Sequence, residues 1–172
     1  MPEDAHSFEV SSAAGTRLEA ERSGDGPPVL LLHGLTATRR YVLQGSHLLA
    51  RRGHRVVSYD ARGHGGSSAA PNAAAYEYAD LVGDLRAVLD QLELERPALV
   101  GSSMGAATAM ALALEDPARV SALVQITPAY DGQGRQDPDD LAHWDGLADA
   151  LARADADAFV ERSELNLSLI HI

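Results

Sequence analysis

The amino-acid sequence predicts an α/β fold, in which a mostly parallel sheet is flanked by helices on both faces. Continuous apolar runs such as VLLLHG at residues 29–34 are typical of strands that are buried on both faces of a parallel sheet. Amphipathic helical segments separate these runs, and strands that alternate with helices imply right-handed crossovers. The chain has 172 residues, of which 45% are hydrophobic, and this composition suits one globular domain.

The first part of the chain contains four predicted strands and one predicted helix. Residues 7–10 and 16–24 form a leading pair of strands, and GDGPP at residues 24–28 is a turn before the first buried strand. YVLQGSHLLARRG at residues 41–53 predicts a helix that ends on a C-terminal glycine. HRVVSYD at residues 54–60 predicts the second buried strand.

The next part continues the alternation. Residues 76–94 predict a helix, PALVG at residues 97–101 a third buried strand, and residues 120–130 a fourth. Between the last two strands a helix begins near Met104 and stops before Pro117. One face of the helix at 76–94 carries the larger side chains, which are Tyr78, Leu81, Leu85, Val88, Leu89 and Leu92.

A tight turn of glycine and serine joins the third buried strand to its helix, in LVGSSMGAATAMAL at residues 99–112. The pattern G-x-S-x-G places Ser103, and not Ser102, at the apex between Gly101 and Gly105. A side chain at either flanking position would collide with the adjacent strand or helix. The turn lifts the serine hydroxyl to a helix N-terminus, where free N–H groups favour developing negative charge. A Gly/Ser-rich turn without chemistry is the alternative.

Small and polar residues follow each of the first three buried strands. HGLT at residues 33–36 follows the first strand, DARGHGGS at residues 60–67 follows the second, and the turn at Ser103 follows the third. Ligands bind at the carboxyl ends of the strands in sheets of this kind. The three turns are therefore predicted to converge on one site.

Composition excludes several classes of protein. The net charge of -11 argues against binding to nucleic-acid phosphates or anionic membranes, and the absence of cysteine excludes disulfides, thiolate zinc sites and a cysteine nucleophile. The N-terminus, MPEDAHSFEV, lacks the basic and apolar regions of a signal peptide, and no apolar run approaches the length of a membrane span. We expect a cytoplasmic protein with no metal and no other cofactor; its oligomeric state stays open.

The three turns together resemble the α/β-hydrolase fold family, in the order and at the spacing of HGLTATRR, DARGHGGS and GSSMG. The resemblance covers residues 8–130. It implies that Ser103 is a nucleophile and that the backbone N–H groups of Leu35 and Met104 form an oxyanion hole. Gly34 would allow the first turn to approach closely.

Four charged or titratable residues of these turns have competing interpretations. His33 and His64 could be bases, but we expect His33 to brace its loop through a hydrogen bond and His64 to be exposed packing in a glycine-rich turn. Asp60 and Arg62 could bind substrate, but their place at the strand exit and the family resemblance favour structural hydrogen bonding within the turn.

A serine nucleophile also needs a base and a carboxylate that orients the base. The resemblance places both after the nucleophile, in the order serine, acid, histidine. His143 lies inside a predicted helix, His171 lies in the last six residues, and Asp131 before Gly132 is favoured as a turn residue. We therefore expect the acid and the histidine of the triad beyond the end of this chain.

The sequence after the fourth buried strand predicts a different kind of segment. Residues 1–130 are expected to form the N-terminal part of the hydrolase core without its last strands, and residues 131–166, which are polar and then helical, resemble the start of a cap or lid. LSLIHI at residues 167–172 resembles a translated transposon end used as a sequencing adapter, so we predict a non-native tail. A short apolar native tail is the alternative.

The expected function is that of a serine hydrolase acting on a small-molecule carboxylic ester, lactone or related acyl bond through an acyl-enzyme. The fragment itself is expected to lack most turnover, because it lacks a general base. By the resemblance, a serine at position 103 argues against haloalkane dehalogenases and epoxide hydrolases, which use aspartate there. Carbon–carbon bond hydrolases, cofactor-free haloperoxidases and a noncatalytic binding domain of the same fold are the alternatives.

Overall fold

The computed structural model describes residues 5–12, 15–44, 46–128, 138–153, 157–158 and 161. Its described part contains one six-stranded sheet with the spatial order β1-β2-β4-β3-β5-β6. The strands are β1 (His6–Ser11), β2 (Arg17–Ser23), β3 (Pro28–Leu32), β4 (Arg55–Tyr59), β5 (Ala98–Ser102) and β6 (Ala122–Ile126).

The sheet is parallel over four strands and antiparallel at one side. β4, β3, β5 and β6 pair in parallel, whereas β1 and β2 form a hairpin that joins β4 in antiparallel orientation. Leu30 lies at the centre of the parallel part, in register with Val57 of β4 and Leu99 of β5. All three side chains are fully buried, so these continuous apolar runs form the middle of the core.

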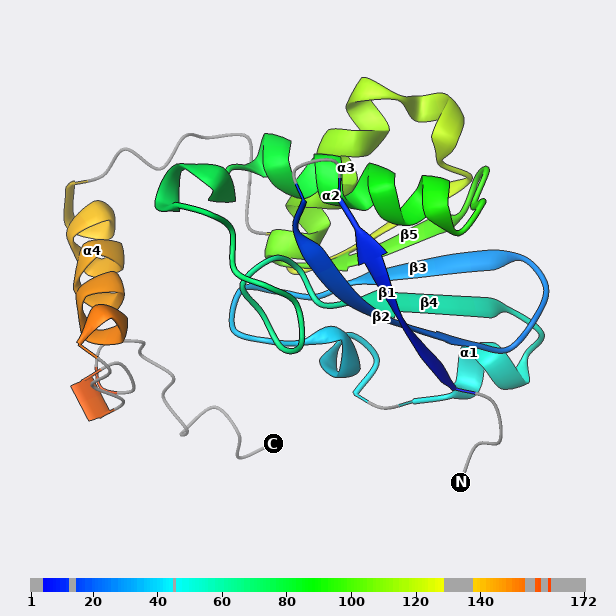
Figure 1. The fold of residues 1–172 in the computed structure, drawn as a ribbon, viewed down its shortest axis with the longest axis horizontal. Coiled ribbons are helices and arrows are strands. Elements are labelled where there is room, and N and C mark those ends of the chain that lie inside the picture. Colours follow the sequence, from blue (N-terminus) through cyan, green and yellow to red (C-terminus); the bar gives the residue numbers. More distant parts are fainter. Residues whose placement is uncertain are drawn as a thin grey trace. The chain divides into compact units, whose positions relative to one another are not determined.

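Helices cover both faces of the sheet, as the alternation of strands and helices predicts (Figure 1). α2 (Tyr78–Gln91) and α3 (Met104–Glu115) lie on one face, where residues such as Leu85 and Leu112 join the larger apolar cluster. α1 (Leu48–Arg51) lies on the other face, where Leu49 packs against a smaller cluster. The fold class and the strand order along the chain are therefore confirmed.

The helix predicted at residues 41–53 is largely wrong. A 3₁₀ turn (η1, Arg39–Tyr41) is followed by further turns, and only α1 is α-helical in this stretch. Gln44 has a φ of +48°, which a continuous right-handed helix does not allow. The predicted C-terminal glycine is correct, because Gly53 has a φ of +81° and the N–H of His54 donates to Leu49 O at 3.2 Å.

Two burial predictions also need correction. Tyr78, predicted on the same face of the helix as Leu81 and Leu85, does not share their burial, because it is 44% exposed at the first residue of α2. β6 is not buried on both faces, because Val124 is 47% and Ile126 is 38% exposed. Within the described part of the chain β6 is an edge strand paired only with β5, which accounts for its half-exposed pattern.

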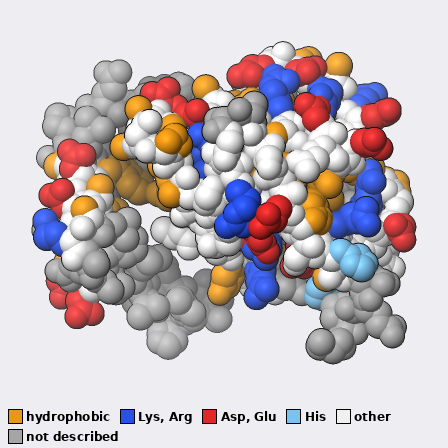
Figure 2. All heavy atoms as spheres, in the orientation of Figure 1, with side chains coloured by type: hydrophobic (Ala, Val, Ile, Leu, Met, Phe, Trp, Pro, Cys, Tyr) orange, Lys and Arg blue, Asp and Glu red, His pale blue; other side chains and the backbone are white. Residues whose placement is uncertain are grey.

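The chain divides into two compact units, Met1–Asp131 and Gly132–Ile172. The first unit holds the whole sheet, and the second contains α4 (Pro138–Ala152). The helices that the structure describes are all too short or too polar to cross a bilayer. On the face of the protein seen in Figure 2, the basic side chains lie among acidic ones, in keeping with surface ion pairs such as Arg119 with Asp90 at 2.7 Å.

Candidate active site

Ser103 lies at the apex of the turn between β5 and α3. Its φ of +49° and ψ of -112° fall outside the regions that residues with side chains usually adopt. The Ser103 N–H donates to Ile126 O of β6 at 3.0 Å, and Ser103 O accepts the first hydrogen bond of the helix from Ala107 N–H at 3.1 Å. These backbone contacts hold a conformation that the serine alone would avoid.

The two glycines that flank this serine are required by close packing. A Cβ on Gly101 would collide with the backbone of Gly105 and Ala106 in the first turn of α3. A Cβ on Gly105 would collide with the backbone of Leu32 and His33, at the end of β3. The helix therefore approaches β3 and β5 more closely than any larger residue would permit, as the G-x-S-x-G pattern predicts.

The turn after β3 lies directly beside the serine. A Cβ placed on Gly34 would lie 3.4 Å from Ser103 Cβ, which is close to ordinary van der Waals contact, so the two turns adjoin but the predicted need for glycine at position 34 is not shown. The carbonyl of Gly34 accepts hydrogen bonds from the ring Nδ1 of His33 at 2.7 Å and from the backbone N–H of Ala37 at 3.1 Å. The same peptide unit carries the N–H of Leu35, so these contacts contribute to its orientation.

His33 braces this turn and is not placed as a base. Its ring is 2% exposed, and its Nε2 accepts a hydrogen bond from the backbone N–H of Ala61 at 2.9 Å, after β4. The proton of the neutral ring is thereby assigned to Nδ1, which donates to Gly34 O. Burial lowers the pKa of His33 and keeps the imidazole neutral. The predicted bracing role is confirmed.

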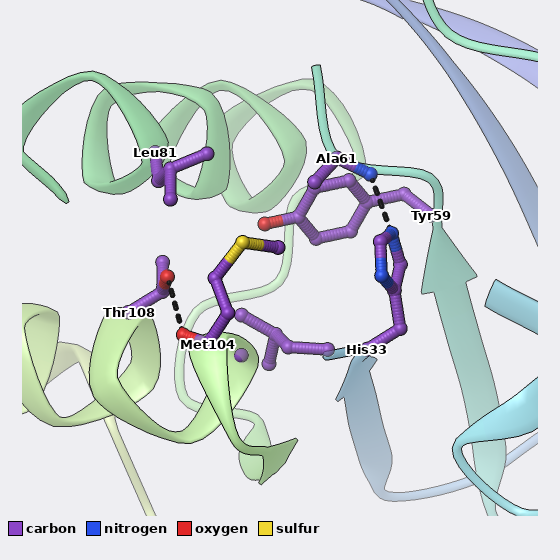
Figure 3. A pocket seen from close by; sticks show the side chains of 8 residues that line it. His33, Tyr59, Ala61, Leu81, Met104 and Thr108 are labelled. Atoms are coloured by element: carbon purple, nitrogen blue, oxygen red, sulfur yellow. Dashed lines mark hydrogen bonds between the residues drawn. The ribbon is translucent and has the colours of Figure 1, made fainter. Parts of the chain in front are cut away.

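The interior behind the turn leaves little free space. A cavity of about 10 Å³ lies here, and Thr108 Oγ1 donates to Met104 O at 2.9 Å. His33, Tyr59 and Met104 line this cavity (Figure 3). A volume of this size holds at most one water molecule. This cavity is therefore too small to hold a substrate.

His64 contacts two backbone carbonyl oxygens with its two ring nitrogens. Nδ1 lies 2.9 Å from Arg62 O, and Nε2 lies 2.7 Å from Leu35 O. The ring also lies 5.0 Å from the ring of His33, centroid to centroid. The expectation of exposed packing is wrong, since the ring is hydrogen-bonded and only partly exposed; the expectation that it is not a base agrees with this arrangement.

Asp60 ties the turn after β4 to the loop after β3. Its carboxylate forms an ion pair with the Arg39 guanidinium and accepts the backbone N–H of Arg39 at 2.7 Å and that of Gly66 at 2.9 Å. Its carbonyl accepts the hydroxyl of Ser67 at 2.6 Å. Asp60 is fully buried, so its predicted structural role is confirmed. Arg39 was missed, although a carboxylate at the end of a buried strand requires a nearby cation.

Arg62 pairs with a different carboxylate, Asp84 of α2. The two groups are joined by Nε to Oδ2 at 2.7 Å and by Nη2 to Oδ1 at 2.8 Å, and both side chains are almost fully buried. Hydrogen bonding to Asp84 raises the pKa of the guanidinium. The substrate-binding alternative for Asp60 and Arg62 is thus excluded by their partners. Asp84 was also missed, although an acid between Leu81 and Leu85 on an apolar helix face was the available signal.

The partners that a catalytic serine requires are not assembled in the described residues. Asp131 and His171 lie outside the residues that the structure describes, as does the predicted tail at 167–172. His143 lies within α4, in the second unit. Among the described residues, the Ser103 hydroxyl has no hydrogen-bond partner, and no three His, Asp or Glu side chains are grouped as metal ligands.

The chain was compared with known proteins. The sequence model of the alpha/beta hydrolase fold matches residues 27–170. The chain is 35% identical to epoxide hydrolase 2 of Siraitia grosvenorii over 67% of the chain and 37% of the relative. It is 37% identical to the sn-1-specific diacylglycerol lipase ABHD11 of Xenopus laevis over 59% of the chain and 32% of the relative.

Solved structures give the same result. The crystal structure of the epoxide hydrolase VrEH1 from Vigna radiata superposes with a TM-score of 0.74 and 28% identity, covering 84% of the chain and 47% of that structure. The chain spans only 37% and 32% of the length of the two relatives named above and 47% of VrEH1. The family model matches most of the chain, and the sheet and the serine turn described above agree with that match. The chain belongs to the alpha/beta hydrolase fold family.

Proposed function

We propose that the protein containing these residues is a serine hydrolase that cleaves a carboxylic ester, lactone or related acyl bond of a small molecule. The observation that carries the proposal is the strained serine at the apex of a turn that only glycine can flank. Residues held in sparsely populated backbone conformations cluster at active sites, because the surrounding structure must stabilise them. Ser103, with its φ of +49°, is such a residue.

The comparisons support hydrolysis as the broader class of reaction. The relatives include epoxide hydrolases and a diacylglycerol lipase. An ester-type substrate is favoured over an epoxide because the sequence has serine at the apex, where the family resemblance implies aspartate in epoxide hydrolases. A deprotonated serine attacks an ester carbonyl and displaces the alcohol, which leaves an acyl-enzyme that a water molecule then hydrolyses.

In the proposed mechanism, the turn after β5 supplies the nucleophile, and the turns after β3 and β5 each supply one backbone donor for the oxyanion. Ser103 Oγ attacks the substrate carbonyl carbon while a base takes the hydroxyl proton. The oxygen of the tetrahedral intermediate accepts hydrogen bonds from the backbone N–H groups of Leu35 and Met104. The protonated base then donates its proton to the leaving alcohol, and a water molecule repeats the sequence on the acyl-enzyme. Both proposed donors lie on rigid turns, so they need no reorganisation during the reaction.

The base and its carboxylate are proposed to come from the part of the whole protein outside this chain. The ring nitrogens of His33 and His64 both contact backbone groups, so neither ring offers a free lone pair to Ser103. We propose further that residues 131–166 begin a lid and that residues 167–172 are not native. Sequencing the locus tests whether residues 167–172 are native. A genomic stop codon directly after Ile172 would contradict the proposal that they are not.

The test compares two proteins, the product of the full reading frame at the locus and residues 1–172. Each is assayed with a short-chain aryl ester, with an aryl epoxide, and with a serine-directed fluorophosphonate probe. We expect the full-length protein to hydrolyse the ester and to bind the probe. Ser103→Ala is expected to abolish both, while Ser102→Ala serves as the adjacent control and retains labelling. Residues 1–172 should show almost no turnover.

Three outcomes would contradict the proposal. Turnover of the epoxide without turnover of the ester would assign the protein to a different chemistry of the same family. Labelling that persists in Ser103→Ala would place the nucleophile elsewhere. A full-length protein that folds but neither hydrolyses the ester nor binds the probe would favour a noncatalytic binding domain with the same turn.

A further inference from the structure

His64 holds a backbone carbonyl in the turn that carries a proposed oxyanion donor. Its Nε2 lies 2.7 Å from Leu35 O, which is the shorter of its two contacts with carbonyl oxygens. The backbone of His64 is itself fixed by the turn after β4, since its N–H donates to Ala61 O at 3.0 Å and its carbonyl accepts Ser67 N–H at 2.9 Å. The ring therefore reaches from a rigid turn on β4 to the turn after β3.

The two histidines hold consecutive carbonyls of the same turn. His33 Nδ1 donates to Gly34 O, and His64 Nε2 lies against Leu35 O. The peptide unit that contains Gly34 O also contains the N–H of Leu35, and the next peptide unit contains Leu35 O. With both carbonyls bound, the torsions on either side of Leu35 are fixed, and so is the direction of its N–H.

The chemistry of the ring determines where its proton must be. A carbonyl oxygen only accepts hydrogen bonds, so a ring nitrogen that binds one must carry a hydrogen. A neutral imidazole has one N–H and can serve only one of the two carbonyls, whereas an imidazolium has two and serves both. In either form we place a hydrogen on Nε2, whose contact with Leu35 O is the shorter of the two.

We propose that His64 is a positioning residue for the oxyanion hole, a role that rests on the serine-hydrolase function proposed above. Its Nε2–H donates to Leu35 O and thereby holds the Leu35 N–H toward the site beside Ser103. The second contact, from Nδ1 to Arg62 O, lies within the turn after β4 and does not reach the turn that carries Leu35.

Two amide substitutions separate the two contacts. The amide nitrogen of His64→Gln occupies the place of Nε2 and can still donate to Leu35 O. The amide nitrogen of His64→Asn occupies the place of Nδ1 and can reach only Arg62 O. We expect His64→Asn to lower kcat by roughly 10- to 100-fold with little change in KM, as small misplacements of catalytic groups do. His64→Gln should recover most of this loss.

A purely structural role of His64 predicts a different result. If the ring only stabilises the turn after β4, His64→Asn should be the milder change, and kcat should follow the thermal stability of each variant. Equal kcat in wild type and His64→Asn, or a larger loss in His64→Gln than in His64→Asn, would overturn the proposal. Loss of hydrolysis in Ser103→Ala in the same assay confirms that the measured turnover belongs to the proposed reaction.

A measurement without turnover separates this inference from the proposed function. Nitrogen-15 NMR of the histidine rings reports whether the His64 proton is on Nε2, and the amide signal of Leu35 reports the state of the turn. We expect a proton on Nε2, and a Leu35 signal that shifts in His64→Asn but stays near the wild-type position in His64→Gln. A proton on Nδ1 alone, or an unchanged Leu35 signal in His64→Asn, overturns the proposal even if the protein hydrolyses nothing.

Discussion

At the scale of single residues, burial is the largest influence on the pKa of His33 and outweighs the opposing effect of the Asp60 charge. Because burial lowers its pKa in the folded protein below the ordinary value of 6.5, the unfolded chain binds this proton more readily. We expect the free energy of unfolding to decrease as the pH falls below 6.5, down to the folded pKa, by at most about 1.4 kcal/mol per pH unit. Above pH 6.5 the residue contributes no pH dependence.

The measurement is urea unfolding at pH values from about 8 to about 5, for wild type and His33→Gln. The glutamine Oε1 can still accept the N–H of Ala61, but the side chain does not titrate. Carboxylates contribute equally to both proteins, so the difference between the two curves isolates His33. Parallel curves throughout the acidic range would contradict the predicted shift.

A second residue-scale prediction concerns the buried carboxylate of Asp84. Asp84→Asn removes the nearer and more buried of the two carboxylates that compensate Arg62, which is 2% exposed; the other, Asp80, lies 3.4 Å from Nη1 and is 33% exposed. Leaving one partner of a buried ion pair uncompensated typically costs about 3–5 kcal/mol. We expect a loss of this order in the free energy of unfolding, measured by chemical denaturation.

The control for this change lies on the same helix. Asp90 forms an ion pair with Arg119 at 2.7 Å, but its side chain is 64% exposed. Asp90→Asn is expected to change the free energy of unfolding by no more than about 1 kcal/mol, because solvent screens the pair. Similar losses in the two variants would show that burial is not the deciding factor.

At the scale of elements, two helical glycines should respond to alanine in opposite ways. Gly105 lies in the first turn of α3, where a Cβ would collide with the backbone at the end of β3. Gly83 lies in the interior of α2, where a Cβ would meet nothing within 4 Å. We expect Gly105→Ala to destabilise the protein by about 1–3 kcal/mol and Gly83→Ala to stabilise it by about 0.5–1 kcal/mol.

Thermal or urea unfolding of the two variants checks this prediction, since both add the same methyl group to an α-helix. Stabilisation by Gly105→Ala would mean that β3 and α3 are packed less closely than described. A comparable loss of stability in Gly83→Ala would mean that the space around Gly83 is not open as described.

Elements with strong periodicity could be predicted from the sequence, and those governed by turns could not. β3, α2, β5 and α3 follow the predicted ranges closely because continuous apolar runs and helical spacing decide them. The stretch at 41–53 contains good helix formers, but Gln44 adopts a φ of +48° and interrupts the helix. A positive φ at a residue other than glycine cannot be predicted from the residue types around it.

The candidate site shows the same division. The glycine pattern around Ser103 predicts the close packing of backbone that the structure has at this turn. The position of His33 directly before Gly34 likewise predicts that His33 braces the loop. The partners of Asp60 and Arg62, in contrast, are Arg39 and Asp84, which lie 21 and 22 positions away along the chain. Pairing across elements depends on how helices and loops dock, and a single sequence does not specify that docking.

At the scale of the whole molecule, the two edges of the sheet differ in polarity. β1 presents polar residues such as Ser7 at one edge, whereas β6 exposes Val124 and Ile126 at the other. An exposed apolar edge strand is a template for pairing with another chain. We expect residues 1–172 to self-associate through β6, and Val124→Lys to reduce this association in sedimentation velocity or light scattering.

The matched control is Ser7→Lys, which adds the same charge to the polar edge and should leave self-association unchanged. An equal reduction in both variants would indicate a general effect of net charge, since the protein carries -11 at pH 7. Association that persists in Val124→Lys would place the contact on another surface.

The neighbouring positions of β3 and β5 have a consequence for how such a protein acquires new substrates. Hydrogen bonds between these adjacent strands set the spacing of the turns that follow them, at about 4.8 Å per strand. Substitution of surrounding side chains leaves that spacing unchanged. Directed evolution toward a different substrate is therefore expected to accumulate changes in residues outside these two turns, while residues 33–35 and 101–105 stay constant.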